Sequence, residues 1–161
     1  MVGVTSCDTN GMWRSHVNYV KLSPTAHEPV QGSTYAAGWD LYADLELQSR
    51  ITLAPGEVRK ISTGIAIELP QGTFGAVYPR SGMATKRGLV LANGTGIIDS
   101  DYRGELIVAL KNTSNEVQIV EHGERIAQIV VTPYIPVLFN EVNSIGTTAR
   151  GEGGFGSTGT K

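Results

Sequence analysis

Short apolar runs cut by turn residues limit what this chain can fold into more than any other feature. Runs such as GIAIELP, FGAVYP, EVQIVE and RIAQIVVTPYI are rich in β-branched residues, and Gly or Pro lies in or beside most of them. No window of about 11 residues or more shows the apolar period of about 3.6 that marks an amphipathic helix. The pattern predicts an all-β sandwich or jelly roll, with one short helix at SGMATKRG, Ser81–Gly88.

The expected strands and domain limits follow from the same pattern. Residues 23–38 are interpreted as a long loop and residues 54–57 as a turn. The other strand candidates are VNYVKL (17–22), DLYADLEL (40–47), GLVLANG (88–94), GELIVALKN (104–112) and VLFNEV (137–142). We expect a flexible N-terminal arm (1–15), a β-barrel domain (16–144) and a flexible glycine-rich C-terminal flap (145–161).

Composition excludes several classes of protein. The 161 residues suit one domain, and 40% hydrophobic residues are enough for a core. A net charge of −2 and no basic tail argue against a nucleic-acid partner. Cys7 is the one cysteine, which rules out an internal disulfide, and no apolar run approaches a membrane span or a signal peptide. We expect a soluble, intracellular protein, in the cytoplasm or the nucleus.

The C-terminal stretch RGEGGFGSTG has the ingredients of a flap for a nucleotide phosphate. Its glycines allow backbone N–H groups to form an anion nest, and Arg150 offers a planar fork for phosphate oxygens. Phe155 offers a face for base stacking, and Ser157 and Thr158 add hydroxyl donors. The spacing is not a Walker motif, because Ser157 stands in place of the lysine. The alternative is a disordered glycine-rich tail.

Two further stretches hold candidate site residues. In YPRSGMATKRG, Arg80 and Ser81 open the short helix and could bind an anion, although an ordinary N-cap serine is the simpler interpretation. In LANGTGIIDSDYRGE, the Asn-Gly and Thr-Gly pairs predict a hairpin. Asp99 follows two large apolar residues and is a candidate general base, unless Asp99 and Asp101 only cap a turn.

Two more stretches hold polar residues at strand positions. In AAGWDLYAD, Asp40 begins a strand and could face a metal, an arginine or solvent. In GERIAQIV, Arg125 and Gln128 interrupt an apolar strand, and Gln128 needs a partner, either a ligand phosphate or a neighbouring backbone group. The three histidines lack metal-site spacing, so we expect no transition metal.

The stretches AGWDLYA, PRSGMA, GIIDSDYRGE, GERIAQ and RGEGGFGSTG resemble the five ordered motifs of the trimeric dUTPases, over residues 37–159. The resemblance implies a jelly-roll β-barrel and a homotrimer with active sites at the subunit interfaces. It also implies Mg²⁺-dependent hydrolysis of dUTP to dUMP and pyrophosphate, which keeps uracil out of DNA and supplies dUMP for dTTP synthesis.

The resemblance also implies residue roles. Asp99 would activate a water for attack on the α-phosphorus, and Tyr102 would pack on the deoxyribose and exclude a 2′-hydroxyl. Phe155 would stack on uracil, and uracil would otherwise be read by the segment that includes Asn93, Gly96, Ile97, Ile98 and Ile107. The phosphates would be bound by Arg80, Ser81, Gly82, Gln128, Arg150, Gly156, Ser157 and Thr158. Asp40 would contact Mg²⁺ through water, with the three phosphates as the main metal ligands.

Two other functions compete with this interpretation. A dCTP deaminase shares the implied fold, but that family usually has serine where Gly82 stands and lacks the Gly-Phe-Gly-Ser-Thr ending. A bifunctional deaminase–triphosphatase is less well excluded. A catalytically silent relative that binds a nucleotide or a protein is disfavoured by the presence of Asp99, Tyr102, Arg150 and Phe155.

Overall fold

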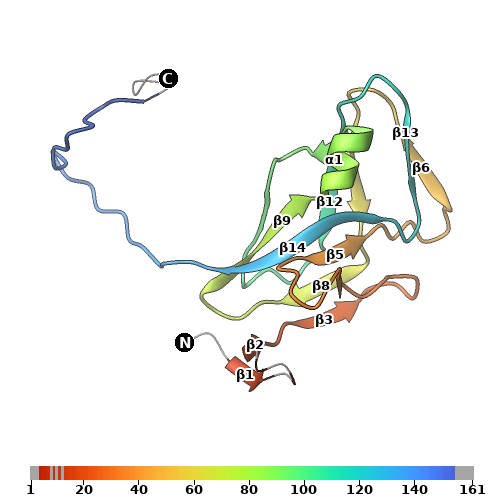
Figure 1. The fold of residues 1–161 in the computed structure, drawn as a ribbon, viewed down its shortest axis with the longest axis horizontal. Helices are drawn as coiled ribbons and strands as arrows, with labels where there is room; N and C mark the ends of the chain where they lie inside the picture. The colour runs from red at the N-terminus through yellow and green to blue at the C-terminus, as the bar shows by residue number, and fades with distance from the viewer. Residues whose placement is uncertain (1–3, 8, 10, 12, 155–161) are drawn as a thin grey trace.

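The chain folds into a barrel of short antiparallel strands with one helix against it, and residues 18–133 are called the barrel below (Figure 1). The computed structural model describes residues 4–7, 9, 11 and 13–154. Its elements, in chain order, are β1 (Val4–Cys7), β2 (Trp13–Ser15), β3 (Asn18–Lys21), β4 (Val30–Gln31), β5 (Trp39–Tyr42), β6 (Arg50–Leu53), β7 (Val58–Ser62), β8 (Ile65–Glu68), β9 (Thr73–Pro79), α1 (Ser81–Arg87), β10 (Leu89–Leu91), β11 (Gly96–Ile98), β12 (Ile107–Asn112), β13 (Gln118–Glu121) and β14 (Arg125–Pro133).

The largest sheet has the order β11-β9-β14-β5-β4, so strands distant in the sequence lie side by side. A second sheet has the order β10-β12-β7, and β3 pairs with β8, β13 with β6, and β1 with β2. At the centre of the large sheet, Gln128 lies opposite Asp40 on β5 and opposite Tyr78 on β9. Three segments of the chain therefore meet around one residue of β14.

The core is aliphatic and continuous. Side chains alternate between buried and exposed along β12, as expected for a strand with one face on a core. Helix α1 adds Met83 to this core and ends at Gly88, whose φ of 65° is the left-handed conformation that favours glycine. The most deeply buried large apolar residues are Leu41, Leu53, Ile61, Ile65, Leu89, Leu106, Leu110, Val120 and Ile126.

Asp44 is a buried carboxylate that ties loops of the barrel together. Its Oδ1 accepts hydrogen bonds from Thr25 Oγ1 at 2.7 Å and from the backbone N–H of Glu46 at 3.3 Å, and Nδ1 of His122 lies 3.7 Å away. Burial raises the pKa of Asp44, but hydrogen bonds from Thr25, Ser23 and Glu46, with the nearby His122, outweigh burial and hold the pKa below 3.8. The folded barrel therefore favours the charged form.

The expected all-β class and the short helix are confirmed, but the long loop expected at residues 23–38 contains β4, which pairs with β5, and two further local predictions are wrong. Residues 137–142 form no strand, because no described segment lies beside them to accept and donate ladder hydrogen bonds. The Asn-Gly turn forms, with the Gly94 N–H donating to the Leu91 carbonyl, but it does not close a hairpin. The strands on either side, β10 and β11, pair with β12 and β9 in different sheets.

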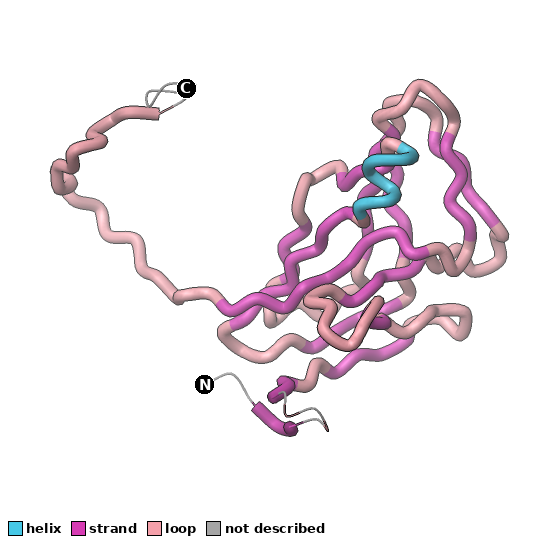
Figure 2. Tube along the Cα trace, in the orientation of Figure 1, coloured by secondary structure: helices cyan, strands magenta, loops and turns pink. Residues whose placement is uncertain are grey.

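The two ends of the described chain differ. In the segment expected to be an arm, β1 pairs with β2, a hairpin that the sequence pattern did not predict. Residues 134–154 contain no strand or helix and lead away from the barrel (Figure 2). Within the described part of the chain, no helix is long and apolar enough to cross a membrane.

Candidate functional site

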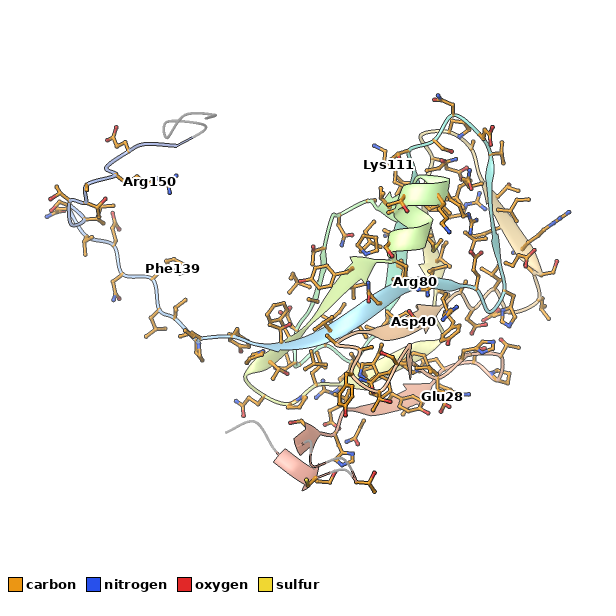
Figure 3. All side chains as sticks on the ribbon, in the orientation of Figure 1. Glu28, Asp40, Arg80, Lys111, Phe139 and Arg150 are labelled. Carbon is orange, nitrogen blue, oxygen red and sulfur yellow. The ribbon has the colours of Figure 1, made fainter. Side chains whose placement is uncertain are left out.

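A nearly buried carboxylate lies between two arginines where β5, β9 and β14 meet. Arg80 Nε lies 2.9 Å from Oδ1 of Asp40, and Arg125 Nη1 lies 3.3 Å from Oδ2 of the same side chain. Asp40 is only 8% exposed, whereas the side chains of Arg80 and Arg125 are 30% and 49% exposed. The arrangement leaves one net positive charge that faces solvent. Figure 3 shows Asp40 and Arg80 next to each other on the barrel.

The sheet register explains why these residues meet. Cross-strand neighbours share a face, so Gln128 and Asp40 lie on the same side of the sheet. Arg125 would lie on the opposite side if β14 alternated regularly. The register shifts between Arg125 and Ala127, and such a bulge re-aims a side chain. The bulge accounts for the contact between Arg125 and Asp40.

Gln128 is held in place by two neighbours. Its Nε2 donates to the carbonyl of Pro79 at 3.2 Å, directly before Arg80. A Cβ on Gly38 would lie 2.6 Å from Gln128 Oε1, so the side chain needs a glycine at this position. Gln128 thus has the neighbouring backbone as a partner, and this contact fixes the chain that leads into Arg80.

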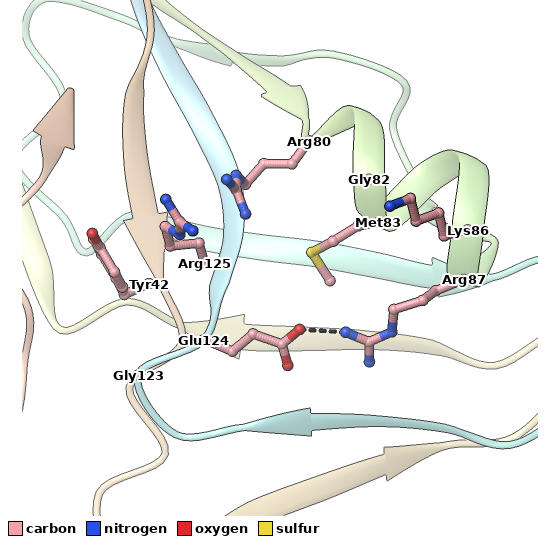
Figure 4. Close-up of a pocket in the computed structure, with 9 residues that line it drawn as sticks. All are labelled: Tyr42, Arg80, Gly82, Met83, Lys86, Arg87, Gly123, Glu124 and Arg125. Atoms are coloured by element: carbon pink, nitrogen blue, oxygen red, sulfur yellow. Dashed lines mark hydrogen bonds and ion pairs between the residues drawn. The ribbon is translucent and has the colours of Figure 1, made fainter. Parts of the chain in front are cut away.

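A cleft of about 530 Å³ opens beside this group (Figure 4). Its wall includes Arg80, Gly82 and Arg125, together with Lys86 from α1. Arg87 also lines it but is paired with Glu124, and it donates to the Gln118 side chain and the Ile119 carbonyl. Unpaired guanidinium donors in a cationic cleft suit phosphate oxygens. Ser81 is exposed and begins α1, while Arg80 occupies the N-cap position without a side-chain cap bond.

Asp99 lies elsewhere, in an exposed turn after β11. The backbone N–H of Tyr102 donates to the Asp99 carbonyl at 3.1 Å, which closes the turn. The hydroxyl of Tyr102 donates to the Glu105 carbonyl at 3.0 Å, and its ring lies so close to Gly104 that a Cβ there would be 2.3 Å from the hydroxyl oxygen. The turn therefore holds the tyrosine in one position and presents the Asp99 carboxylate to solvent.

The residues expected to read uracil surround this turn. Ile98 is half-buried and packs on the core, whereas Ile97 is 58% exposed. Gly96 lies against β9, where a Cβ would be 3.1 Å from Cβ of Val77. Asn93 is exposed in the preceding turn, and Ile107, 52% exposed, begins β12.

The described chain does not bring all the predicted residues together. Asp99 and Ile97 line a second cleft of about 900 Å³, and neither lines the cleft of Arg80 and Gly82. Arg150 is exposed on the segment that leaves the barrel, where its Nε donates to the Gly153 carbonyl at 2.9 Å. The other predicted flap residues, Phe155, Gly156, Ser157 and Thr158, lie outside the described residues.

The donor set argues against a metal ion held by this chain alone. Among the described residues, no group of three or more His, Cys, Asp or Glu side chains could hold one. Each oxygen of Asp40 faces a guanidinium, so the local field attracts an anion and repels a free cation. These residues fit a metal that arrives with the phosphates of a nucleotide.

The cleft lined by Arg80, Gly82, Lys86 and Arg125 is called the phosphate-type cleft below. The sequence assigned no role to three residues in or near it. Arg125 was noticed but not assigned, because a bulge cannot be read from alternation. Lys86 and Gly38 were not considered. The position of Lys86 on the short helix that follows Arg80 could have indicated Lys86, but Gly38 acts through a contact with Gln128 that only the fold creates.

Comparison with known proteins gives a consistent result. The dUTPase family model matches residues 25–159. Deoxyuridine 5'-triphosphate nucleotidohydrolases from Desulfitobacterium hafniense (strain DSM 10664 / DCB-2) and Anaplasma marginale (strain St. Maries) are 47% and 46% identical. These matches cover 89% and 82% of this chain, and 94% and 88% of the relatives.

Solved structures agree. A mutant of the Staphylococcus bacteriophage 80alpha dUTPase with dUpNHpp matches with a TM-score of 0.80 and 29% identity, over 89% of this chain and 98% of that one. The expected jelly-roll-like β fold is thereby confirmed. The order of the motifs, the fold and the extent of the family match agree, and the chain belongs to the dUTPase family.

Proposed function

We propose that this protein hydrolyses dUTP to dUMP and pyrophosphate. The observation that carries the proposal is the cationic cleft lined by Arg80 and Arg125, which both contact Asp40 beside it, since their solvent-facing guanidinium groups suit a triphosphate. Family membership supports the substrate and the reaction class.

In the proposed reaction, the Asp99 carboxylate accepts a proton from a water molecule. The water oxygen attacks the α-phosphorus, the bond between this phosphorus and the bridging oxygen to the β-phosphate breaks, and pyrophosphate leaves. The exposure of Asp99 gives water access to its carboxylate, and the ring of Tyr102, whose hydroxyl is held by the Glu105 carbonyl, would pack on the deoxyribose. Uracil is read by Asn93, Gly96, Ile97, Ile98 and Ile107, around the turn.

Mg²⁺ enters this proposal as part of the substrate complex. When bound with the substrate, the metal would neutralise phosphate charge and polarise the α-phosphorus. The protein's own groups bind the phosphates through Arg80, Ser81, Gly82 and Gln128. A water-mediated contact between Asp40 and the metal stays a prediction.

The active site is proposed to form between subunits of a homotrimer. Asp99 and Arg80 lie in different clefts of one chain, so a second copy is needed to bring them to the same nucleotide. The C-terminal flap, residues 145–161, then closes over the nucleotide. Arg150 would neutralise phosphate, Phe155 would stack on uracil, and Gly156, Ser157 and Thr158 would bind the γ-phosphate. The division into an arm (1–15), a barrel domain (16–144) and this flap belongs to the same proposal.

The test is pyrophosphate release from dUTP, dTTP, dCTP and UTP at equal concentrations with Mg²⁺, with the bases identified by chromatography. Only dUTP should be hydrolysed. Asp99→Asn should lower its turnover by about 10²–10⁴-fold while the protein still binds dUpNHpp, because only the base is removed. Ammonia and a uracil product from dCTP would assign the protein to the deaminases. No turnover of any nucleotide would leave a binding protein, and a near-normal rate for the variant would remove Asp99 from the mechanism.

A further inference from the structure

Asp40 contacts both exposed arginines of the phosphate-type cleft, and this position suggests a role that needs no metal. We infer that Asp40 is a positioning residue, which orients Arg80 so that its two terminal nitrogens face the triphosphate. The inference rests on the proposed function, because it names how the same cleft is prepared for its substrate.

The nitrogen that Arg80 uses is the first part of the argument. Nε of Arg80 faces Oδ1 of Asp40 at 2.9 Å, and no described residue bonds to the terminal nitrogens. A guanidinium has five N–H donors in a fixed plane. This ion pair leaves the four N–H groups on the terminal nitrogens for the parallel pair of bonds that phosphate oxygens favour.

Arg125 supplies the second part of the argument. Its Nη1 faces the other oxygen of Asp40 at 3.3 Å. If Arg80 paired side-on with both oxygens of Asp40, it would use Nε for one oxygen and one terminal nitrogen for the other. Arg125 occupies part of the acceptor capacity of the second oxygen, and the contact of Arg80 with this carboxylate is through Nε, so both terminal nitrogens of Arg80 stay available.

The burial of Asp40 keeps Arg80 in contact with it. The Asp40 side chain is 11% exposed, and a carboxylate so far from water is costly to leave without partners. Rotation of Arg80 away from Asp40 would remove one of its two partners. The carboxylate therefore restrains the arginine before substrate arrives, which lowers the cost of ordering it on binding.

The experiment is a double-mutant cycle on nucleotide affinity. Calorimetry would give the dissociation constant of dUpNHpp for the wild type, Asp40→Asn, Arg80→Ala and the double variant, in EDTA and again in Mg²⁺. Each single substitution should weaken binding by about tenfold or more, and the double variant should bind about as weakly as Arg80→Ala alone. Glu57→Gln removes an exposed carboxylate that pairs with Arg59 on another part of the barrel, and it should bind like the wild type.

Arg80→Lys gives a second test that does not alter the buried carboxylate. A lysine ammonium cannot offer Nε to Asp40 and a planar pair of donors to phosphate at once. This variant should therefore lose most of the affinity that Arg80→Ala loses. Thermal melting of each variant would show that it is folded, and Arg80→Lys decides the question if Asp40→Asn does not fold.

The outcomes separate the inference from the proposed function. Failure of the wild type to bind dUpNHpp in either buffer would contradict the proposed function. If the wild type binds, additive losses in the double variant would overturn the inference, and so would wild-type affinity of Arg80→Lys. A loss in Asp40→Asn that is seen only with Mg²⁺ would overturn it too, in favour of a metal contact.

Discussion

The phosphate-type cleft and the C-terminal segment differ in how their side chains are held before substrate binds. In the cleft, Arg80 is held by a buried partner and Gln128 by the Pro79 carbonyl, all within one barrel. In residues 134–154, the Arg150 side chain hydrogen-bonds the Gly153 carbonyl, and apolar side chains such as Phe139, 98% exposed, have no cover from the residues that the structure describes. The first region is organised by its own chain, whereas the second is organised only if something else covers it.

The difference indicates which substitutions should change substrate binding and which should change catalysis or assembly. A group already fixed by the fold contributes to affinity without further ordering, and a free segment must be ordered when it binds. We therefore expect changes in the cleft to act on nucleotide affinity with the assembly intact. Changes in the segment should act on catalysis or assembly with the barrel intact.

Removal of residues 150–161 should have the largest effect. It deletes Arg150 and the part of the flap that follows it, so dUTP hydrolysis should fall by about 100-fold or more, the loss typical of one removed charge-stabilising group or greater. The melting temperature and the number of subunits found by sedimentation should stay unchanged, because the described part of the deleted segment has only local hydrogen bonds. Loss of the trimer on truncation would show that the segment is structural.

Next in size is the replacement of both Leu138 and Phe139 by serine. Their side chains are 92% and 98% exposed, and burial of each against another copy would contribute about 1.5–3 kcal/mol per subunit. The double variant should shift from the proposed trimer toward monomer in sedimentation equilibrium. Leu47→Ser is the control, since Leu47 is 100% exposed on the barrel and should leave the mass unchanged. Equal masses for all three proteins would refute a covering role for another copy.

A smaller effect is expected for Gly38→Ala. The new Cβ would lie 2.6 Å from Gln128 Oε1 and must displace this side chain. KM for dUTP should rise by about threefold to thirtyfold, the range for a lost or misplaced hydrogen bond of about 0.5–2 kcal/mol. Gly32→Ala is the matched control, because no atom lies within 4 Å of its added Cβ. If both variants have the same KM, the position of Gln128 does not matter for phosphate binding.

The smallest effect concerns Asp44 and acid. Its pKa is lowered in the folded state, so its contribution to stability is complete above about pH 3.8 and is lost as the pH falls through the lower folded value. Asp44→Asn lacks this titration and should be less stable than the wild type at pH 7, with the difference shrinking toward pH 3. Denaturant unfolding across this range measures it. Parallel stability curves for the two proteins would exclude Asp44 as an acid-sensitive group.

Sequence reasoning reached the elements whose signals are local. Gly88 marks the end of α1 because its left-handed conformation favours glycine, and β14 was evident from its length and its β-branched residues. The predictions were wrong where the structure of a segment depends on which strand it pairs with. The Asn-Gly signal at residues 93–94 gave a turn but no hairpin, since the flanking strands found other partners. VLFNEV has strand composition but no neighbour within the described chain.

The candidate site shows the same limit. The motifs identified Asp40, Arg80 and Gln128 one at a time, through a resemblance. They could not show that Asp40 pairs with two arginines, because the pairing depends on the register of β14 against β5 and on a bulge. Such contacts depend on how strands that are far apart in the sequence pair in the sheet, and no local sequence motif reports this pairing.

The central place of β14 has a consequence for how the protein is made. Both β5 and β9 pair with β14, which is the last strand in the sequence. During synthesis from the N-terminus, the large sheet has two unpaired strand edges until residues 125–133 are available. Such edges attract other chains, so a ribosome that stalls before residue 125 would release a product prone to aggregation. Rapid synthesis through residues 125–133 would protect the yield of this protein.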